Sequence, residues 1–175
     1  MTMWSPQKQE MKISVTRASE EDAPAIAVLR TLVAEHLTRE HGKGHWSSCV
    51  TEKSVLRAIR TSRVLVARNR RDIVGTMRLE TKKPWAIDLA YFTSVGQPLY
   101  LHDMAVVPNL QRQGIGRKLV EEAKAVARAW PTEAIRLDAY DSDAGAGPFY
   151  SKCGFLEVGR KNYRGVPLVY YELIL

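Results

Sequence analysis

A short glycine-containing loop, Gln111-Arg112-Gln113-Gly114-Ile115-Gly116, has the residue types and the spacing of a phosphate-binding turn. It stands between an apolar run typical of a buried strand and a stretch with helical periodicity. The first turn of a helix presents unpaired backbone N–H groups and a partial positive charge, which together attract anions. Gly114 and Gly116 lack the Cβ that would keep a diphosphate from the backbone, and they tolerate dihedral angles that aim successive N–H groups inward. The loop therefore predicts a diphosphate site.

The elements on either side must hold this loop between the end of a strand and the start of a helix. The strand is expected over residues 99–107, where apolar β-formers are followed by Pro108-Asn109. The helix is expected from Arg117 to about Trp130, because apolar residues there recur at three- and four-residue intervals. Two other phosphate loops do not fit. The P-loop requires a Gly-Lys-Ser/Thr ending, and the Rossmann fingerprint requires a third glycine where Leu119 stands.

Two separate segments carry a match to one family. The first is Gln/Arg-x-x-Gly-x-Gly/Ala after a strand that ends in an Ala-Val pair. The second is Gly147-Pro148-Phe149-Tyr150-Ser151-Lys152-Cys153-Gly154-Phe155, which is similar to a Phe-Tyr-x-x-x-Gly-Phe segment at the expected distance downstream. Together they resemble the GNAT superfamily of acyl-CoA-dependent acyltransferases.

The resemblance implies a single-domain α/β GNAT fold. This fold has a mixed, mostly antiparallel central sheet of about seven strands flanked by about four helices, and its fourth and fifth strands splay apart. Residues 11–175 are expected to form the domain, and residues 1–10 a mobile N-terminus. Residues 85–96 could extend a strand or form a short helix. Periodicity and turn residues place other strands at 13–17, 63–67, 73–80, 134–140, 155–161 and 166–173, and other helices from Ser19 to about His36, at 52–60 and through 150–152.

The resemblance also implies acetyl-CoA as cosubstrate and no metal. The diphosphate part has independent support, because N–H donors and arginine are the groups that bind a diphosphate. Contacts of the Met104 and Val106 backbone with the pantetheine amides follow from the resemblance alone. The full set of expected cofactor contacts is Met104, Ala105, Val106, Gln111, Arg112, Gln113, Gly114, Gly116, Arg117 and Lys118.

Acetyl transfer to an amine needs a stabilised oxyanion, an acid for the leaving thiolate and a base for the amine. The resemblance assigns the oxyanion contact to the backbone N–H of Met104, a donor fixed before the reaction. It assigns the general acid to Tyr150, because a phenol with a reference pKa of about 10 keeps its proton at neutral pH.

The base has three candidates. His102 is the first, because an imidazole with a reference pKa of about 6.5 suits neutral pH. Strand alternation is expected to put His102 on the same face as Tyr100 and Met104 and to turn Asp103 to the other face. The segment also resembles the Leu-His-x-Leu-Ala-Val strand of arylalkylamine acetyltransferases. A histidine merely hydrogen-bonded inside the sheet is the alternative, with Glu80 or a water chain then serving as the base.

The acceptor amine is expected to lie against the polar loop at residues 37–48, which forms one wall of the cleft in GNAT folds. On that resemblance Glu35, His41, His45 and Trp46 are candidate substrate contacts, and Glu80 joins them from its strand. Asp141 replaces an asparagine that often contacts the cofactor, so Asp141 or its neighbour Asp143 is a candidate for attracting a cationic amine. Three of the four histidines fall between positions 36 and 45, but without a tidy set of ligands for a metal.

Composition sets further limits. The 175 residues carry a formal charge of +7, yet the densest basic run, Arg68-Asn69-Arg70-Arg71, reads as a turn without interleaved aromatic residues. We therefore expect no specific nucleic acid partner, and a basic surface that steers coenzyme A. Cys49 and Cys153 have no paired spacing, residues 1–12 do not resemble a signal peptide, and no apolar run approaches the length of a membrane span.

These observations predict a cytoplasmic N-acetyltransferase that moves an acetyl group from acetyl-CoA to a primary amine of a small molecule or peptide. Two alternatives stay open: a catalytically silent module that binds acyl-CoA, and an acetyltransferase for protein N-termini or lysines. No membrane partner is expected. Many relatives dimerise, so a homodimer is a further expectation.

Overall fold

A single mixed sheet of seven strands organises the computed structural model, which describes residues 11–175. The strands lie in the order β1-β2-β3-β4-β5-β7-β6, and every neighbouring pair is antiparallel except β4 and β5. This arrangement confirms the expected fold class. The expected mobile segment 1–10 lies outside the described residues. The strands are β1 (Ile13–Arg17), β2 (Arg63–Asn69), β3 (Asp72–Glu80), β4 (Pro98–Val106), β5 (Ala134–Tyr140), β6 (Leu156–Tyr163) and β7 (Val166–Ile174).

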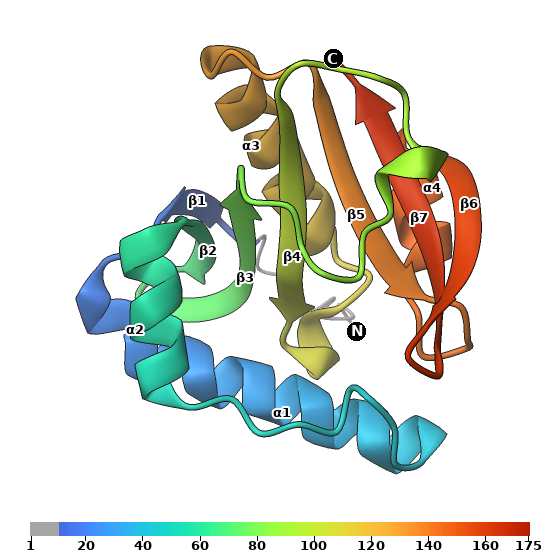
Figure 1. Ribbon diagram of the computed structural model, residues 1–175. Coiled ribbons are helices and arrows are strands. Elements are labelled where there is room, and N and C mark those ends of the chain that lie inside the picture. Colours follow the sequence, from blue (N-terminus) through green and yellow to red (C-terminus); the bar gives the residue numbers. More distant parts are fainter. Residues whose placement is uncertain (1–10) are drawn as a thin grey trace, which may run out of the picture.

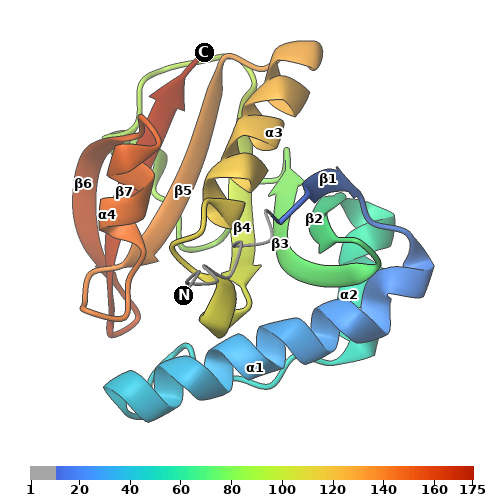
Figure 2. The same ribbon diagram turned by 180° about the vertical axis from the view of Figure 1, so that it is seen from behind.

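Helices cover both faces of the sheet. Within residues 11–175 there are four α-helices: α1 (Ala23–His41), α2 (Glu52–Thr61), α3 (Ile115–Ala129) and α4 (Gly147–Lys152). The back face, toward the viewer in Figure 2, carries α3 and α4. The front face, toward the viewer in Figure 1, carries α2 and the segment 81–97, with α1 running along its lower edge. No helix within the described residues has the length and apolar composition needed to span a membrane.

Each face of the sheet has its own apolar core. On the back face, Leu119 and Ala123 of α3 pack in one cluster with Leu101 of β4 and Leu137 of β5. This is the apolar stripe that the helical periodicity predicts, and burying it fixes α3 against the sheet. On the front face, buried residues of α1 and α2 pack against β2, among them Ile26, Val55, Ile59, Val64 and Val66.

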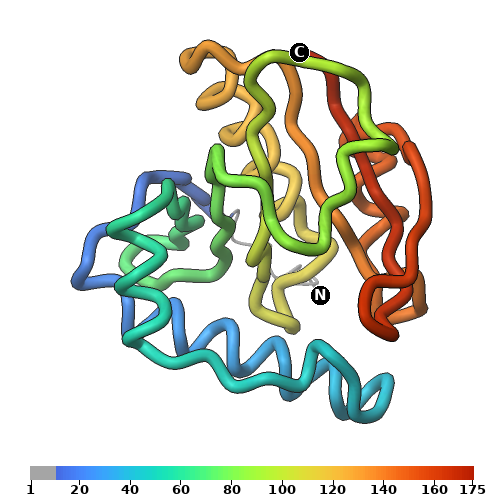
Figure 3. Tube along the Cα trace, in the orientation of Figure 1, coloured from blue at the N-terminus to red at the C-terminus, as the bar shows by residue number. Residues whose placement is uncertain are grey.

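The parallel pair β4 and β5 stays together over only three residues. Pro98–Tyr100 pairs with Ala134–Arg136, and beyond Tyr100 the pairing of β4 is with β3 alone. Figure 1 and, as a Cα trace in the same orientation, Figure 3 show the two strands diverging toward their C-terminal ends. The edge of β4 that faces β5 is therefore free over residues 101–106, which confirms the expected splay.

A bulge in β4 overturns the expected alternation around His102. Asp103 has a left-handed backbone with φ of +54°. The register with β3 shifts there, because Arg78 pairs with His102 whereas Thr76 pairs with Ala105. One additional residue in a strand reverses the faces of all that follow. Met104 therefore joins the back-face cluster and does not share a face with His102, and Asp103 turns to the front, where it contacts Arg78.

Several expected boundaries also need correction. The first helix runs to His41 rather than to about His36, and it stops at Gly42, whose φ is +78°. Helix α3 begins at Ile115 rather than at Arg117, because Gly114 at φ of +85° already starts its first turn. Residues 85–96 form mainly irregular chain with a 3-10 turn at Leu89–Tyr91. The carboxylate of Asp88 caps this turn by accepting a hydrogen bond of 3.1 Å from the backbone N–H of Ala90.

A buried ion pair attaches the segment 81–97 to the front face. Arg136 Nε lies 2.9 Å from Glu172 Oε1, and the two side chains are 4% and 3% exposed. Glu172 Oε2 also accepts a hydrogen bond of 3.2 Å from the backbone N–H of Thr93, whose carbonyl accepts one from Arg136. The Arg136 guanidinium lies over the ring of Phe92. The irregular segment is therefore attached to β5 and β7 through the contacts of Thr93 and Phe92 with the buried Arg136–Glu172 pair.

Candidate active site

The turn between β4 and α3 presents a row of unpaired backbone N–H groups. Within residues 11–175, the N–H groups of Arg112 through Arg117 donate no hydrogen bond to another backbone group, and the first N–H of α3 that does so belongs to Lys118. Arg112 and Gly114 both have left-handed backbones, with φ of +61° and +85°. Left-handed residues in a turn direct successive N–H groups toward one point. With the positive end of α3 and the exposed Arg117 side chain, the turn fits a diphosphate.

Other residues of the turn brace it. Gln111 Nε2 donates a hydrogen bond of 3.1 Å to the carbonyl of Val106, and Gln113 Nε2 donates one of 3.3 Å to the carbonyl of Asn109. Gly116 has a packing role, because a Cβ there would lie 3.0 Å from Met104 Cε and 3.1 Å from Phe149 Cζ. The glycine thus lets the first turn of α3 approach β4 and α4 closely.

Tyr150 of α4 reaches the free edge of β4. Its hydroxyl donates to the sulfur of Met104 at 3.6 Å, and its ring packs edge-on against Phe149 and Phe155. The side chain is buried, and this burial raises the pKa of Tyr150 well above its usual value. A thioether is a weak acceptor, so the phenol proton is held but not committed to a strong partner. The structure therefore brings together two of the three expected catalytic residues, Tyr150 and Met104.

The third, His102, lies on the front face in a network of charges. Its Nε2 lies 2.8 Å from Glu80 Oε1, although the ring N–H makes no aligned hydrogen bond. Arg78 contacts Glu80 at 2.6 Å and Asp103 at 3.3 Å, and Arg30 of α1 contacts Asp103 at 2.7 Å. Burial, reinforced by the Arg78 charge, lowers the pKa of His102. A neutral imidazole, as a base requires, is thus favoured at neutral pH.

The front face of β5 carries two polar residues that the sequence analysis missed. Asp138 lies opposite Tyr170 in the register, on the face away from the buried Leu137. Burial raises the pKa of the Asp138 carboxyl. Burial together with the carboxylates of Asp138 and Asp103 raises the pKa of Tyr140. The alternation of polar and apolar residues within 134–140 could have revealed this face, but the sequence interpretation gave the segment only as a strand.

The loop after α1 brings one expected substrate contact to the splay. Trp46 packs edge-on against Tyr140 at the end of β5, with ring centroids 5.5 Å apart, and its Nε1 donates to the carbonyl of Gly42 at 3.0 Å. Glu35 and His45 are exposed, on α1 and on this loop. Trp46 therefore contacts the C-terminal end of β5, whereas within the described residues no hydrogen bond or ion pair ties Glu35 or His45 to the expected catalytic residues.

Asp141 is engaged by a surface arginine. Its two carboxylate oxygens accept hydrogen bonds of 3.0 and 3.2 Å from Arg160 Nη1 on β6. The negative charge expected to attract an amine is thus already balanced. Among residues 11–175 no three histidine, cysteine, aspartate or glutamate side chains are grouped as a metal site. The histidines at 36, 41 and 45 therefore belong to no such group.

Comparison with known families agrees with this geometry. The model of the acetyltransferase (GNAT) family matches residues 29–155, a range that includes the diphosphate turn, His102 and Tyr150. No curated protein sequence matches the chain.

Solved structures share the fold at low sequence identity. The PaiA N-acetyltransferase from Thermoplasma acidophilum, solved in complex with coenzyme A, superposes with a TM-score of 0.74 at 16% identity, covering 94% of this chain and 100% of that one. YncA from Salmonella typhimurium, a putative acetyltransferase with acetyl-CoA, gives 0.68 at 19% identity, with 93% and 94% covered. A ribosomal-protein-alanine N-acetyltransferase from Brucella melitensis gives 0.70 at 20% identity, with 93% and 99% covered.

Proposed function

The chain belongs to the acetyltransferase (GNAT) family, and from this membership we propose that it transfers an acetyl group from acetyl-CoA to a primary amine in a ternary complex. The observation that carries the proposal is the row of unpaired N–H groups at Arg112–Arg117, placed at the same end of the splay as Tyr150 and Met104. An anion site beside a buried acid is what a thioester of a diphosphate-bearing cofactor requires.

The two halves of the cofactor have separate supports. The diphosphate fits the turn, with Arg112, Arg117 and Lys118 supplying positive charge. The free edge of β4 offers the backbone groups of Met104 and Val106 to the pantetheine amides, as another strand would use them. Two structural neighbours were solved with coenzyme A or acetyl-CoA, which supports acetyl-CoA as the cosubstrate here.

His102 serves as the base. Because Nε2 faces the Glu80 carboxylate, that nitrogen carries the proton and Nδ1 keeps the lone pair. Nδ1 takes a proton from the acceptor ammonium, directly or through one water molecule, and the free amine attacks the thioester carbonyl. Arg78 supports this role, because its charge opposes protonation of the imidazole in the resting enzyme.

Met104 and Tyr150 serve the other side of the reaction. The backbone N–H of Met104 donates to the oxyanion that forms when the carbon–nitrogen bond is made. The carbon–sulfur bond then breaks, and Tyr150 gives its hydroxyl proton to the departing thiolate. The attacking nitrogen gives up its second proton, through water, to the Tyr150 phenolate, which restores the phenol, and His102 releases the first proton to solvent. The products are the N-acetylated amine and coenzyme A as a thiol.

The proposal is tested first by calorimetric titration with acetyl-CoA, with desulfo-CoA as a control for recognition of the nucleotide end. We expect both to bind, and we expect a panel of small amines and peptides to yield at least one acetylated product. If neither compound binds, the proposal is refuted. Binding of both with no acetylated amine, peptide N-terminus or lysine would identify a silent acyl-CoA-binding module instead.

A further inference from the structure

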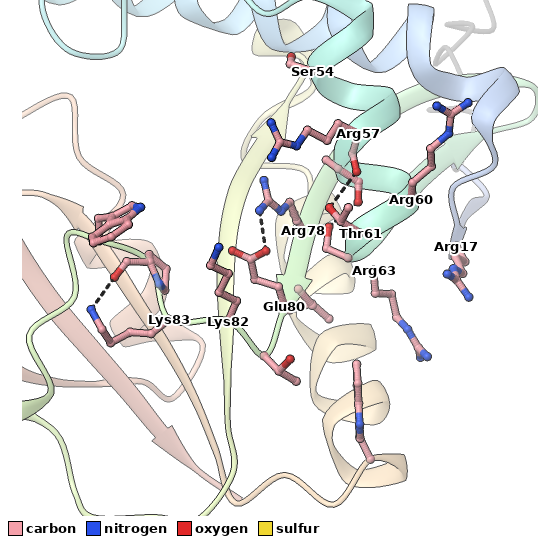
Figure 4. Close-up of a pocket in the computed structure, with 17 residues that line it drawn as sticks. Arg17, Ser54, Arg57, Arg60, Thr61, Arg63, Arg78, Glu80, Lys82 and Lys83 are labelled. Carbon is pink, nitrogen blue, oxygen red and sulfur yellow. Dashed lines mark hydrogen bonds and ion pairs between the residues drawn. The ribbon is translucent and has the colours of Figure 1, made fainter.

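A strongly basic cavity opens on the front face beside the base. Its volume is about 740 Å³, and it lies between α2, the end of β3 and the segment that follows β3. In Figure 4, Arg57, Arg78 and Lys82 lie on the same side of β3 as Glu80, whereas Arg17, Arg60 and Arg63 extend on its other side. Seven cationic side chains and one carboxylate line it: Arg17, Arg57, Arg60, Arg63, Arg78, Lys82, Lys83 and Glu80.

Only some of these charges are balanced within the protein. Arg60 pairs with Glu20 at 2.7 Å, and Arg78 is engaged by the carboxylates described above. Arg57 and Lys82 form no ion pair with any residue from 11 to 175. In Figure 4 both extend on the side of β3 where Glu80 lies, whereas Arg60 points away from it. Arg17, Arg63 and Lys83 likewise form no ion pair with a described residue, so five of the seven cations are uncompensated, and Arg57 and Lys82 are the two that extend on the side of Glu80, the one carboxylate among the lining residues.

The cavity shares two side chains with the network of charges around His102. Arg78 and Glu80 line it, and the same two side chains contact Asp103 and His102. A molecule whose amine lies at His102 can thus place its other end among the cations. The anionic end of such a molecule would meet Arg57 and Lys82, which come from α2 and from the residue pair after β3.

The diphosphate turn occupies a different part of the molecule. Trp130, which lines the cavity, follows the C-terminal end of α3, whereas the turn precedes the N-terminal end of that helix. A helix of 15 residues is about 22 Å long. The basic cavity is therefore separate from the site that fits the diphosphate, and its cations are available to the acceptor.

We propose that the acceptor is a small primary amine that also carries a carboxylate or phosphate group, which Arg57 and Lys82 bind while the amine reaches His102. This inference rests on the proposed function. Unbalanced cations in a concave site raise the local concentration of anions and repel polycations. A guanidinium binds a carboxylate or phosphate through two parallel hydrogen bonds, which fixes its orientation as well as its position.

The test uses matched acceptors and matched variants. 4-Aminobutanoate is compared with 4-aminobutanamide and O-phosphoethanolamine with ethanolamine, so that each pair differs in one anionic group, the second member of each pair carries none, and the two pairs separate carboxylate from phosphate. We expect kcat/KM to be at least about tenfold higher for an anionic member. Arg57→Gln and Lys82→Gln should each raise the KM of that acceptor about tenfold and leave the KM of acetyl-CoA unchanged. Arg60→Gln is the control, because this arginine lines the cavity but is already paired.

The outcomes separate this inference from the proposed function. Equal acetylation of neutral and anionic amines, with Arg57→Gln no worse than Arg60→Gln, would overturn the inference and leave the acetyltransferase intact. If no amine is acetylated, calorimetric titration with O-phosphoethanolamine decides. Binding that is weaker in Arg57→Gln and Lys82→Gln than in Arg60→Gln supports an anion site while the proposed reaction fails. Binding that is absent, or equal in all variants, overturns the anion site too.

Discussion

Replacing Tyr150 with phenylalanine should separate catalysis from folding. The substitution removes one hydroxyl from a ring that is 6% exposed, and it leaves the packing of that ring unchanged. The lost hydrogen bond goes to the sulfur of Met104 at 3.6 Å. A neutral hydrogen bond contributes about 0.5–1.5 kcal/mol, and a thioether is among the weaker acceptors. The free energy of unfolding should therefore change by less than about 1 kcal/mol.

The effect of Tyr150→Phe on turnover should be much larger. Loss of a general acid lowers the rate by about 10²–10⁴-fold, which corresponds to about 2.7–5.5 kcal/mol in the activation free energy. Burial raises the pKa of Tyr150, so the wild-type phenol keeps its proton throughout the range in which enzymes are normally assayed. Titration of Tyr150 should consequently cause no loss of kcat up to about pH 10.

The assay follows release of the coenzyme A thiol with a chromogenic disulfide, at saturating acetyl-CoA, alongside urea unfolding of each variant. Tyr171→Phe is the matched control, because this tyrosine is 5% exposed and its ring lies 6.2 Å from that of Tyr150. Its kcat should stay within about twofold of wild type. A Tyr150→Phe enzyme that unfolds like wild type and keeps kcat within about threefold would refute the assignment of the general acid.

Three further substitutions test other parts of the structure. His102→Gln should lower kcat/KM about 100-fold at neutral pH. Because burial and the Arg78 charge lower the pKa of His102, kcat/KM of the wild type should decrease with falling pH only below the usual imidazole pKa of about 6.5. A decrease that begins above that pH would contradict a base of lowered pKa. Gly114→Ala and the control Gly165→Ala should each lower the free energy of unfolding by about 1–2 kcal/mol, because their φ angles are +85° and +86° and nothing lies within 4 Å of either new Cβ. Calorimetry should show weaker acetyl-CoA binding for Gly114→Ala alone. Equal affinities in the two variants would show that this turn does not belong to the cofactor site. Glu172→Gln leaves the buried Arg136 without its counter-ion, so urea unfolding should show that the free energy of unfolding falls by about 3–5 kcal/mol. A decrease below about 1 kcal/mol would show that the ion pair is not desolvated.

The turn at residues 111–116 and the helix α3 could be predicted from sequence because their causes are local. A glycine at a left-handed position, a helix start and an apolar stripe all lie within residues 111–129, and each can be recognised without knowledge of the rest of the chain. Tyr150 was likewise found through a short segment of fixed spacing. The structure places its hydroxyl against Met104, a contact across 46 residues that no local pattern contains.

The basic cavity could not be predicted for the opposite reason. A formal charge of +7 is a property of the whole chain and does not say where cations gather. Arg57 belongs to α2 and Lys82 to the segment after β3, and only the packing of α2 beside β3 brings them to one cavity. The sequence interpretation distributed these charges over a solvated surface, and it therefore overlooked an anion site on the acceptor side.

The bulge at Asp103 shows why one residue matters for mechanism. Regular alternation would have put His102 and Met104 on the same face of the sheet. The left-handed Asp103 instead leaves His102 at the front with Glu80 and sends Met104 to the back, where it meets Tyr150. The proposed base and the proposed acid then lie on opposite sides of one splayed strand edge. A thioester carbonyl held at that edge can be attacked from the front while its sulfur leaves toward the back, so the two proton transfers need not compete for the same space.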